Sequence, residues 1–149
     1  MKVFLSWSGE LSRELADIFR RWLPSVIQQL QPYFTPDDIA KGARWSSEIA
    51  KELEHSQFGL LFMTRANLSS TWMAFEAGSL AKSVTTAKVV PILFDLKPTD
   101  IEGPLAQFQS IEFSEKSIRA LLQNLNSEIG DASLPAEVLE KYGQSGGQI

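Results

Sequence analysis

A continuous apolar run from Phe58 to Met63 is the feature of the sequence that most constrains the fold. Because no polar side chain interrupts the run, a strand formed by it has to be buried on both faces. Strands of this kind belong to parallel sheets that are covered by helices on both sides. We therefore predict that Phe58 to Met63 is a central strand of such a sheet.

Strand-like and helix-like segments alternate through the rest of the chain. The other predicted strands are Lys2–Ser6, Tyr33–Thr35, Lys88–Phe94 and Ser110–Phe113. Pro91, inside the fourth strand, predicts a bulge or one unpaired side. The alternation of strands and helices predicts an α/β domain with a parallel sheet.

The first predicted helix follows the first strand. Ser8 is its expected N-cap, and Pro24 is expected to end or kink it, with Val26 to Leu30 as a second helical piece. The apolar residues at helical spacing, which predict its buried face, are Leu11, Leu15, Ile18, Phe19 and Trp22.

Three further helices are predicted between and after the later strands. One begins at Trp45, and the next is capped by Ser69 or Ser70. The last is capped by Ser114 and has an apolar stripe made of Ile118, Leu121, Leu122, Leu125 and Ile129.

Length and composition are those of one globular domain. The chain has 149 residues, of which 44% are hydrophobic and 21% are charged. Periodicity is lost after residue 130, so we expect a domain over residues 1–130. Residues 131–149 then form either a tail or a linker to a sensor module, and they include the flexible stretch Gly143 to Gly147.

Charge and composition exclude several function classes. A net charge of -4 without a Lys/Arg cluster argues against direct nucleic-acid binding. No apolar run is long enough to span a membrane and no signal peptide is visible, so we expect a cytoplasmic protein. The absence of cysteine and the single histidine, His55, exclude a disulfide framework and argue against a zinc site.

The carboxyl ends of parallel strands form the rim where ligands bind in sheets of this kind. The loops expected there are Ser6 to Gly9, Pro36 to Arg44 and Thr64 to Ser70. The residues that these loops and the following helix bring toward one rim are Ser6, Trp7, Ser8, Asp37, Asp38, Trp72 and Glu76.

Trp72 and Glu76 are neighbours on one helix surface, since they are four residues apart. One interpretation is an ordinary solvated glutamate beside a packing tryptophan. The other is a functional carboxylate, because a carboxylate partly walled by aromatic side chains is unfavourable without a role.

Common catalytic motifs are missing from the rim. There is no glycine-rich dinucleotide fingerprint, no phosphate loop and no nucleophile elbow. A phospho-receiver domain is disfavoured because Met63 and Thr64 stand where its acceptor aspartate would follow the strand. A lone carboxylate suits chemistry at a sugar, where Glu76 would bind ribose hydroxyls and stabilise developing positive charge. A tryptophan, Trp7, Trp45 or Trp72, would stack on a flat heterocycle.

Three elements, in order, resemble Toll/interleukin-1 receptor (TIR) domains. The segment Phe4 to Ser8 resembles the first conserved box of that family. Asp37, Asp38 and Ile39, followed by Gly42 and Trp45, look like its BB loop and the start of its second helix. The segment Trp72 to Glu76 is similar to the Trp-x-x-x-Glu element of enzymatically active members, and the bacterial pattern continues through Ala81. The resemblance covers Met1 to Ile129.

The resemblance implies a flavodoxin-like, three-layer fold with a five-stranded parallel sheet. It also implies NAD⁺ cleavage at the nicotinamide–ribose bond, which releases nicotinamide and ADP-ribose or a cyclised ADP-ribose. NAD⁺ would be the substrate, with no separate cofactor and no metal. Glu76 would be the catalytic residue. The substrate-binding residues would be Ser6, Trp7, Ser8, Asp38, Lys41, Arg44, Trp45 and Trp72.

In the TIR family activity usually requires assembly of TIR domains through the BB loop. The residues of this chain that the resemblance assigns to assembly are Asp37, Ile39 and Gly42. Bacterial members often serve as toxic effectors in antiviral defence, joined to a sensor module. The sequence departs from the family at Trp7, where tyrosine is usual.

Two other functions stay open at this level. A TIR domain can be a non-catalytic scaffold that works only by self-association, although scaffold members tend to lack the glutamate. A nucleoside-processing α/β enzyme outside the family, such as a deoxyribosyltransferase-like hydrolase, would work without NAD⁺ and without assembly.

Overall fold

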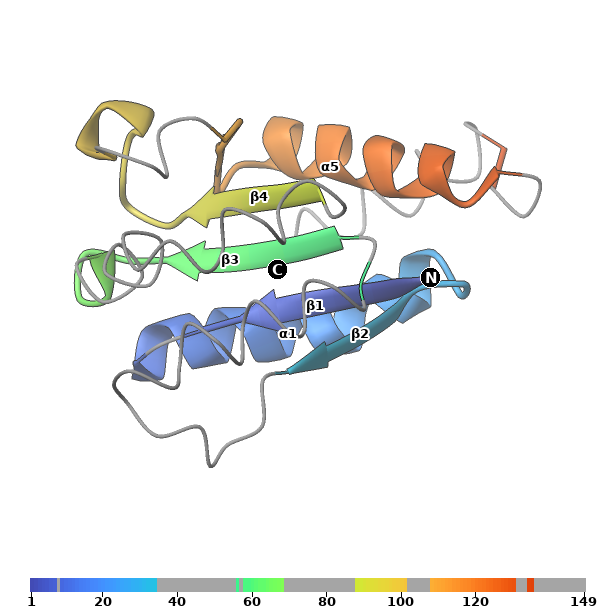
Figure 1. Ribbon diagram of the computed structural model, residues 1–149, viewed down its shortest axis with the longest axis horizontal. Coiled ribbons are helices and arrows are strands. Elements are labelled where there is room, and N and C mark those ends of the chain that lie inside the picture. The colour runs from blue at the N-terminus through green and yellow to red at the C-terminus, as the bar shows by residue number, and fades with distance from the viewer. Residues whose placement is uncertain are drawn as a thin grey trace.

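A five-stranded sheet with all neighbouring strands parallel forms the centre of the structure (Figure 1). The computed structural model describes residues 1–7, 9–34, 56, 58–68, 88–101, 108–130 and 134–135. The strands are β1 (Lys2–Ser6), β2 (Gln31–Phe34), β3 (Phe58–Met63), β4 (Lys88–Leu93) and β5 (Ile111–Glu112). Their order, β2-β1-β3-β4-β5, is that of flavodoxin-like folds, so the predicted fold class is confirmed.

The strand β3 is central, as the apolar run predicts. It pairs with β1 on one side and with β4 on the other, and all of its residues are buried. Leu60, for example, is opposite Leu5 in β1 and Val90 in β4. Burial on both faces explains why the segment has no alternation of polar and apolar residues.

The edge strand β2 is only partly buried. It begins at Gln31, earlier than the sequence predicts, and includes Pro32 opposite Val3 of β1. Proline is tolerated here because an edge strand has one side without a partner strand. Its half-exposed residues account for the weak strand signal in the sequence.

The strand β4 keeps an unbroken register with β3 through Pro91, which is opposite Leu61. The expectation of a bulge is therefore wrong. The described β4–β5 pairing begins only at Ile92, opposite Ile111, so Pro91 precedes that ladder. The predicted unpaired side is what makes the proline acceptable.

The helix α1 (Glu10–Val26) corrects two expectations about its ends. Gly9 is its N-cap, with φ of 89° and no side-chain cap, whereas Ser8 lies outside the described residues. Pro24 lies inside the last turn, because the helix continues to Val26. The second helical piece is absent, since Ile27 is extended and its N–H donates to the Leu23 carbonyl at 2.9 Å.

The buried face of α1 is rotated relative to the predicted stripe. Leu11 is 42% exposed, so its predicted burial is wrong, while its neighbour Ser12 is 1% exposed. The Ser12 hydroxyl donates to the Phe62 carbonyl at 2.7 Å, which holds this small polar residue against the sheet. The residues of α1 that are buried are Ser12, Leu15, Ala16, Phe19, Leu23 and Val26.

The helix α5 (Glu115–Glu128) follows the sequence prediction closely. Ser114 is its N-cap and accepts a hydrogen bond from the Ser117 N–H at 3.3 Å. Leu121, Leu122 and Leu125 are buried. A short 3₁₀ helix, η1 (Pro98–Asp100), lies in the connection between β4 and β5.

The helices α1 and α5 contribute to one hydrophobic core on the sheet. Phe19 of α1 lies 5.1 Å from Phe62 of β3 and 6.0 Å from Phe113, ring centroid to ring centroid. Leu122 and Leu125 of α5 join the same core. The opposite face of the sheet is buried too, and its buried residues include Phe4, Leu61, Met63 and Leu93. The predicted helix from Trp45 lies outside the described residues. Leu68 is already helical, so the predicted helix cap at Ser69 or Ser70 is wrong, and the rest of that helix lies outside the described residues.

The chain contacts this core again beyond residue 130. The Asn126 side chain donates to the Leu134 carbonyl at 2.8 Å and accepts from the Leu134 N–H at 2.8 Å. The Leu134 side chain packs against the core. The packed part of the domain therefore includes at least Leu134.

Candidate functional site

The crevice expected of this fold lies at the carboxyl ends of β1 and β3. The two strands are neighbours, but the chain continues from β1 to β2 on one side and from β3 to β4 on the other. Ligands bind at such a switch point in open α/β sheets. The described residues that follow these strands are Trp7 after β1 and Thr64 to Leu68 after β3.

Ser6 is the last residue of β1 and is opposite Leu61 of β3. It is 4% exposed, because it is still within the paired part of the sheet. Its side chain therefore lies at the inner limit of the crevice.

Trp7 is partly buried and is held by contacts on two sides. Its ring packs edge-on against Phe34 at the end of β2, with ring centroids 6.3 Å apart. The Arg13 guanidinium carbon lies 5.9 Å from the Trp7 ring centroid, within the range of a cation–π contact. These contacts give Trp7 a packing role over the start of α1.

The indole Nε1 of Trp7 is buried and has no hydrogen-bond partner among the described residues. A buried donor without a partner costs about 1–3 kcal/mol. Such a donor beside the crevice can be satisfied by an acceptor atom of a ligand. Trp7 therefore offers both an aromatic surface and a polar handle.

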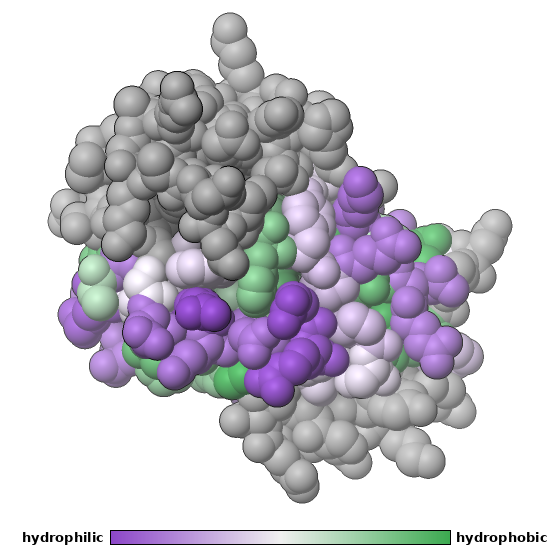
Figure 2. All heavy atoms as spheres, turned by 90° about the horizontal axis from the view of Figure 1, so that it is seen from below, coloured by the Kyte–Doolittle hydropathy of each residue, from purple (hydrophilic) through white to green (hydrophobic). Residues whose placement is uncertain are grey.

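An open groove of about 560 Å³ runs along the outer side of α1 toward Phe34. Figure 2 shows this side of the molecule with hydrophilic side chains in a band between the grey regions. The described residues that line the groove are Glu10, Arg13, Glu14, Asp17, Arg20 and Phe34. Because acids and bases are mixed among them, the groove has no strong preference for an anion or a cation.

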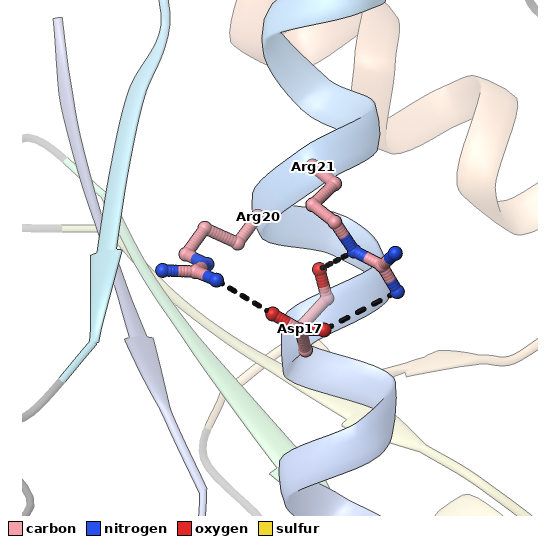
Figure 3. A network of polar contacts seen from close by, with 3 residues as sticks. All are labelled: Asp17, Arg20 and Arg21. Atoms are coloured by element: carbon pink, nitrogen blue, oxygen red, sulfur yellow. Dashed lines mark hydrogen bonds and ion pairs between the residues drawn. The ribbon is translucent and has the colours of Figure 1, made fainter.

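Asp17 holds two arginines at this surface (Figure 3). Its carboxylate accepts from Arg20 Nη2 at 2.8 Å and lies 3.2 Å from Arg21 Nη2. Arg20 extends toward β2, where its guanidinium carbon lies 4.7 Å from the Phe34 ring centroid, while Arg21 points away. Exposed ion pairs of this kind contribute about 0–1 kcal/mol, so their effect is mainly to orient Arg20.

A buried hydrogen-bond network lies directly after β3, the other strand at the switch point. Thr64 is 3% exposed and Asn67 is 2% exposed. The Asn67 side chain bonds to the backbone of Thr64 and of Phe62. The start of this loop is therefore fixed by side-chain contacts as well as by the sheet.

The structure brings two of the predicted site residues, Ser6 and Trp7, to the crevice. The other predicted site and assembly residues lie outside the described part of the chain: Ser8, Asp37, Asp38, Ile39, Lys41, Gly42, Arg44, Trp45, Trp72 and Glu76.

The sequence interpretation missed the contacts that Ser12, Arg13, Phe34 and Asn67 make near the ends of β1 and β3. Asn67 had a detectable signal, because an asparagine shortly after a buried strand is a common turn-former. Ser12 lies one residue beyond the apolar stripe and gave no such signal. The contacts of Arg13 and Phe34 with Trp7 depend on the packing of α1 on β2.

Among the described residues, no group of three or more His, Cys, Asp or Glu side chains could hold a metal ion. No helix within the described ranges has the length and apolar character needed to cross a membrane.

The strand order and the switch-point crevice define a flavodoxin-like α/β protein. Comparison with protein families matches residues 3–125 to the TIR domain, so the chain belongs to the TIR domain family. The match spans both described sides of the crevice and the segment that contains Trp72 and Glu76. A search of curated proteins found no matching sequence.

Proposed function

We propose that this TIR domain is an NAD⁺ glycohydrolase. It cleaves the bond between nicotinamide and ribose and yields nicotinamide with ADP-ribose or a cyclised ADP-ribose. The observation that carries the proposal is the Trp-x-x-x-Glu element, Trp72 to Glu76, within a TIR domain. In the sequence, the segment comes shortly after β3, one of the two strands at the switch point.

Glu76 is the catalytic residue in this proposal. As the bond between ribose C1′ and the nicotinamide nitrogen breaks, its electron pair goes to nicotinamide and positive charge develops on the ribose. A carboxylate close to that charge lowers the barrier. Water then adds at C1′ and loses a proton, or a nitrogen of the adenine in the same molecule attacks to give the cyclised product.

The substrate site of the proposal includes the residues that follow β1. Trp7 supports it, because its partly exposed ring and its unpartnered buried N–H stand at the crevice. Ser6 precedes Trp7 at the end of β1. The residues proposed to complete the site are Ser8, Asp38, Lys41, Arg44, Trp45 and Trp72. Phe34 supports Trp7 from the side of β2.

Self-assembly is proposed to switch the enzyme on. The partners are other TIR domains, and the contact region is the loop with Asp37, Ile39 and Gly42, directly after β2. An effector in bacterial antiviral defence, controlled by a sensor module, is a setting that fits such an activity. The alternative, a scaffold without catalysis, would assemble in the same way but leave NAD⁺ intact.

The test is nicotinamide release from NAD⁺ by assembled wild-type protein and by Glu76→Gln. The substitution keeps the size of the side chain and removes its charge, so turnover should be lost. Glu112→Gln is the matched control, because Glu112 is exposed on β5, the strand at the far edge of the sheet from β2. Full turnover in Glu76→Gln would exclude the proposed catalytic residue.

A further inference from the structure

The turn that follows β3 is closed by one side chain, that of Asn67. The Asn67 side-chain Oδ1 accepts a hydrogen bond from the Thr64 N–H at 2.8 Å, and the Asn67 backbone N–H donates to the Thr64 carbonyl at 3.3 Å. The two bonds join the first and last residues of the turn. Since Asn67 is 2% exposed and Thr64 is 3% exposed, both bonds are shielded from water.

The same side chain also holds the end of β3. Asn67 Nδ2 donates to the Phe62 carbonyl at 2.9 Å, and the Ser12 hydroxyl of α1 donates to that carbonyl at 2.7 Å. One carbonyl oxygen therefore joins three elements: β3, the turn and the first turn of α1. Buried networks of this kind, when satisfied, fix a single local geometry.

The next backbone carbonyl is fixed as well, but by the sheet. The Phe94 N–H donates to the Met63 carbonyl at 2.9 Å. The turn is then the first part of the chain after β3 that the sheet does not hold. Arg65, in the middle of the turn, has Nη2 3.7 Å from Asp100 Oδ2, but its side chain is 66% exposed and adds little.

We propose that Asn67 is a positioning residue for the NAD⁺-cleaving site. Its amide sets the direction in which the chain leaves β3 toward Trp72 and Glu76. This inference rests on the proposed function. An amide suits the role because one end accepts from the Thr64 N–H while the other donates to the Phe62 carbonyl. Aspartate could make only the first contact without taking a proton.

The inference predicts that the Asn67 variants lose turnover while they remain folded. For Asn67→Ala, kcat should fall by on the order of 10²-fold, because displacement of a catalytic group by about 1 Å has that effect. KM should change much less. Asn67→Asp should also lose turnover, since it cannot donate to the Phe62 carbonyl when ionised.

Ser12→Ala is the matched control, because it removes the other donor to the same Phe62 carbonyl without touching the turn. It should retain kcat within about 2-fold, because the catalytic group should not be displaced when the turn is intact. Thermal unfolding of each variant shows whether the fold is kept. A kcat that is unchanged in both Asn67 variants, or that falls equally in Ser12→Ala, would overturn the inference.

A second measurement separates this inference from the proposed function. Amide hydrogen exchange of the full chain reports the Thr64 N–H directly. Asn67→Ala should speed exchange of the Thr64 N–H, and both Asn67 variants should change exchange across the segment from Thr64 to Glu76. Ser12→Ala should leave exchange in that segment unchanged. If wild-type protein releases no nicotinamide, the proposed function fails, and unchanged exchange in both Asn67 variants would then refute the positioning role too.

Discussion

Ser12 shows that a polar residue can be buried beside an apolar stripe that predicts another face for the helix. A stripe of apolar residues predicts that Leu11 faces the sheet, but the structure exposes Leu11 and buries Ser12. The hydroxyl of Ser12 satisfies the Phe62 carbonyl, which lies at the end of a fully buried strand. Burial of a small hydroxyl is tolerated here because it is hydrogen-bonded.

Substitution of Ser12 by alanine is predicted to destabilise the protein by about 1–2 kcal/mol, which is the cost of losing a buried hydrogen bond. The loss is limited because the Phe62 carbonyl keeps the Asn67 amide as a donor. Ser127→Ala is the comparison, since the exposed Ser127 hydroxyl donates to the Asn124 carbonyl at 2.9 Å. Urea unfolding should show a change within about 0.5 kcal/mol for Ser127→Ala. Equal losses in the two variants would contradict this assignment.

At the scale of elements, α1 connects the hydrophobic core with the crevice. Its buried face packs Phe19 against Phe62, and its first turn carries Ser12 and Arg13, which contact the ends of β3 and β1. The opposite side carries the charged residues of the groove. Trp7 is thus contacted by Arg13 of α1 as well as by Phe34 of β2.

Two leucines of α1 test this orientation with the same chemical change. Leu15→Ala should lower the free energy of unfolding by about 2–5 kcal/mol, because it leaves a cavity in the core. Leu15 is 6% exposed and Leu11 is 42% exposed. Leu11→Ala should cost about 1 kcal/mol or less, since less apolar surface returns to water. A larger loss of unfolding free energy in Leu11→Ala than in Leu15→Ala, measured by urea unfolding, would contradict the observed orientation of α1 and favour the predicted burial of Leu11.

For the whole molecule, the sequence predicts the strands best where burial is complete. The segment Phe58 to Met63 has a strand signal because both of its faces are buried, and Ser114 has a cap signal because capping is local. The edge strand β2 has a weak signal, since its residues are half-exposed. Strand order and the seating of α1 depend on contacts between distant segments, which periodicity does not encode.

The candidate site follows the same division. Trp7 and Ser6 can be placed at the crevice from the sequence because they end a strand that is plainly apolar. The support of Trp7 by Arg13 and Phe34 comes from two different elements, α1 and β2, and has no local pattern. The part of the site assigned through Glu76 rests on the family and its Trp-x-x-x-Glu element.

The most direct test of the account is the rate of nicotinamide release from NAD⁺ over a wide range of protein concentration, with assembly followed by light scattering in the same samples. An enzyme switched on by TIR–TIR contacts should show turnover that rises faster than linearly with concentration and follows the assembled fraction. Assembled protein that leaves NAD⁺ intact would contradict the central claim and favour the scaffold function.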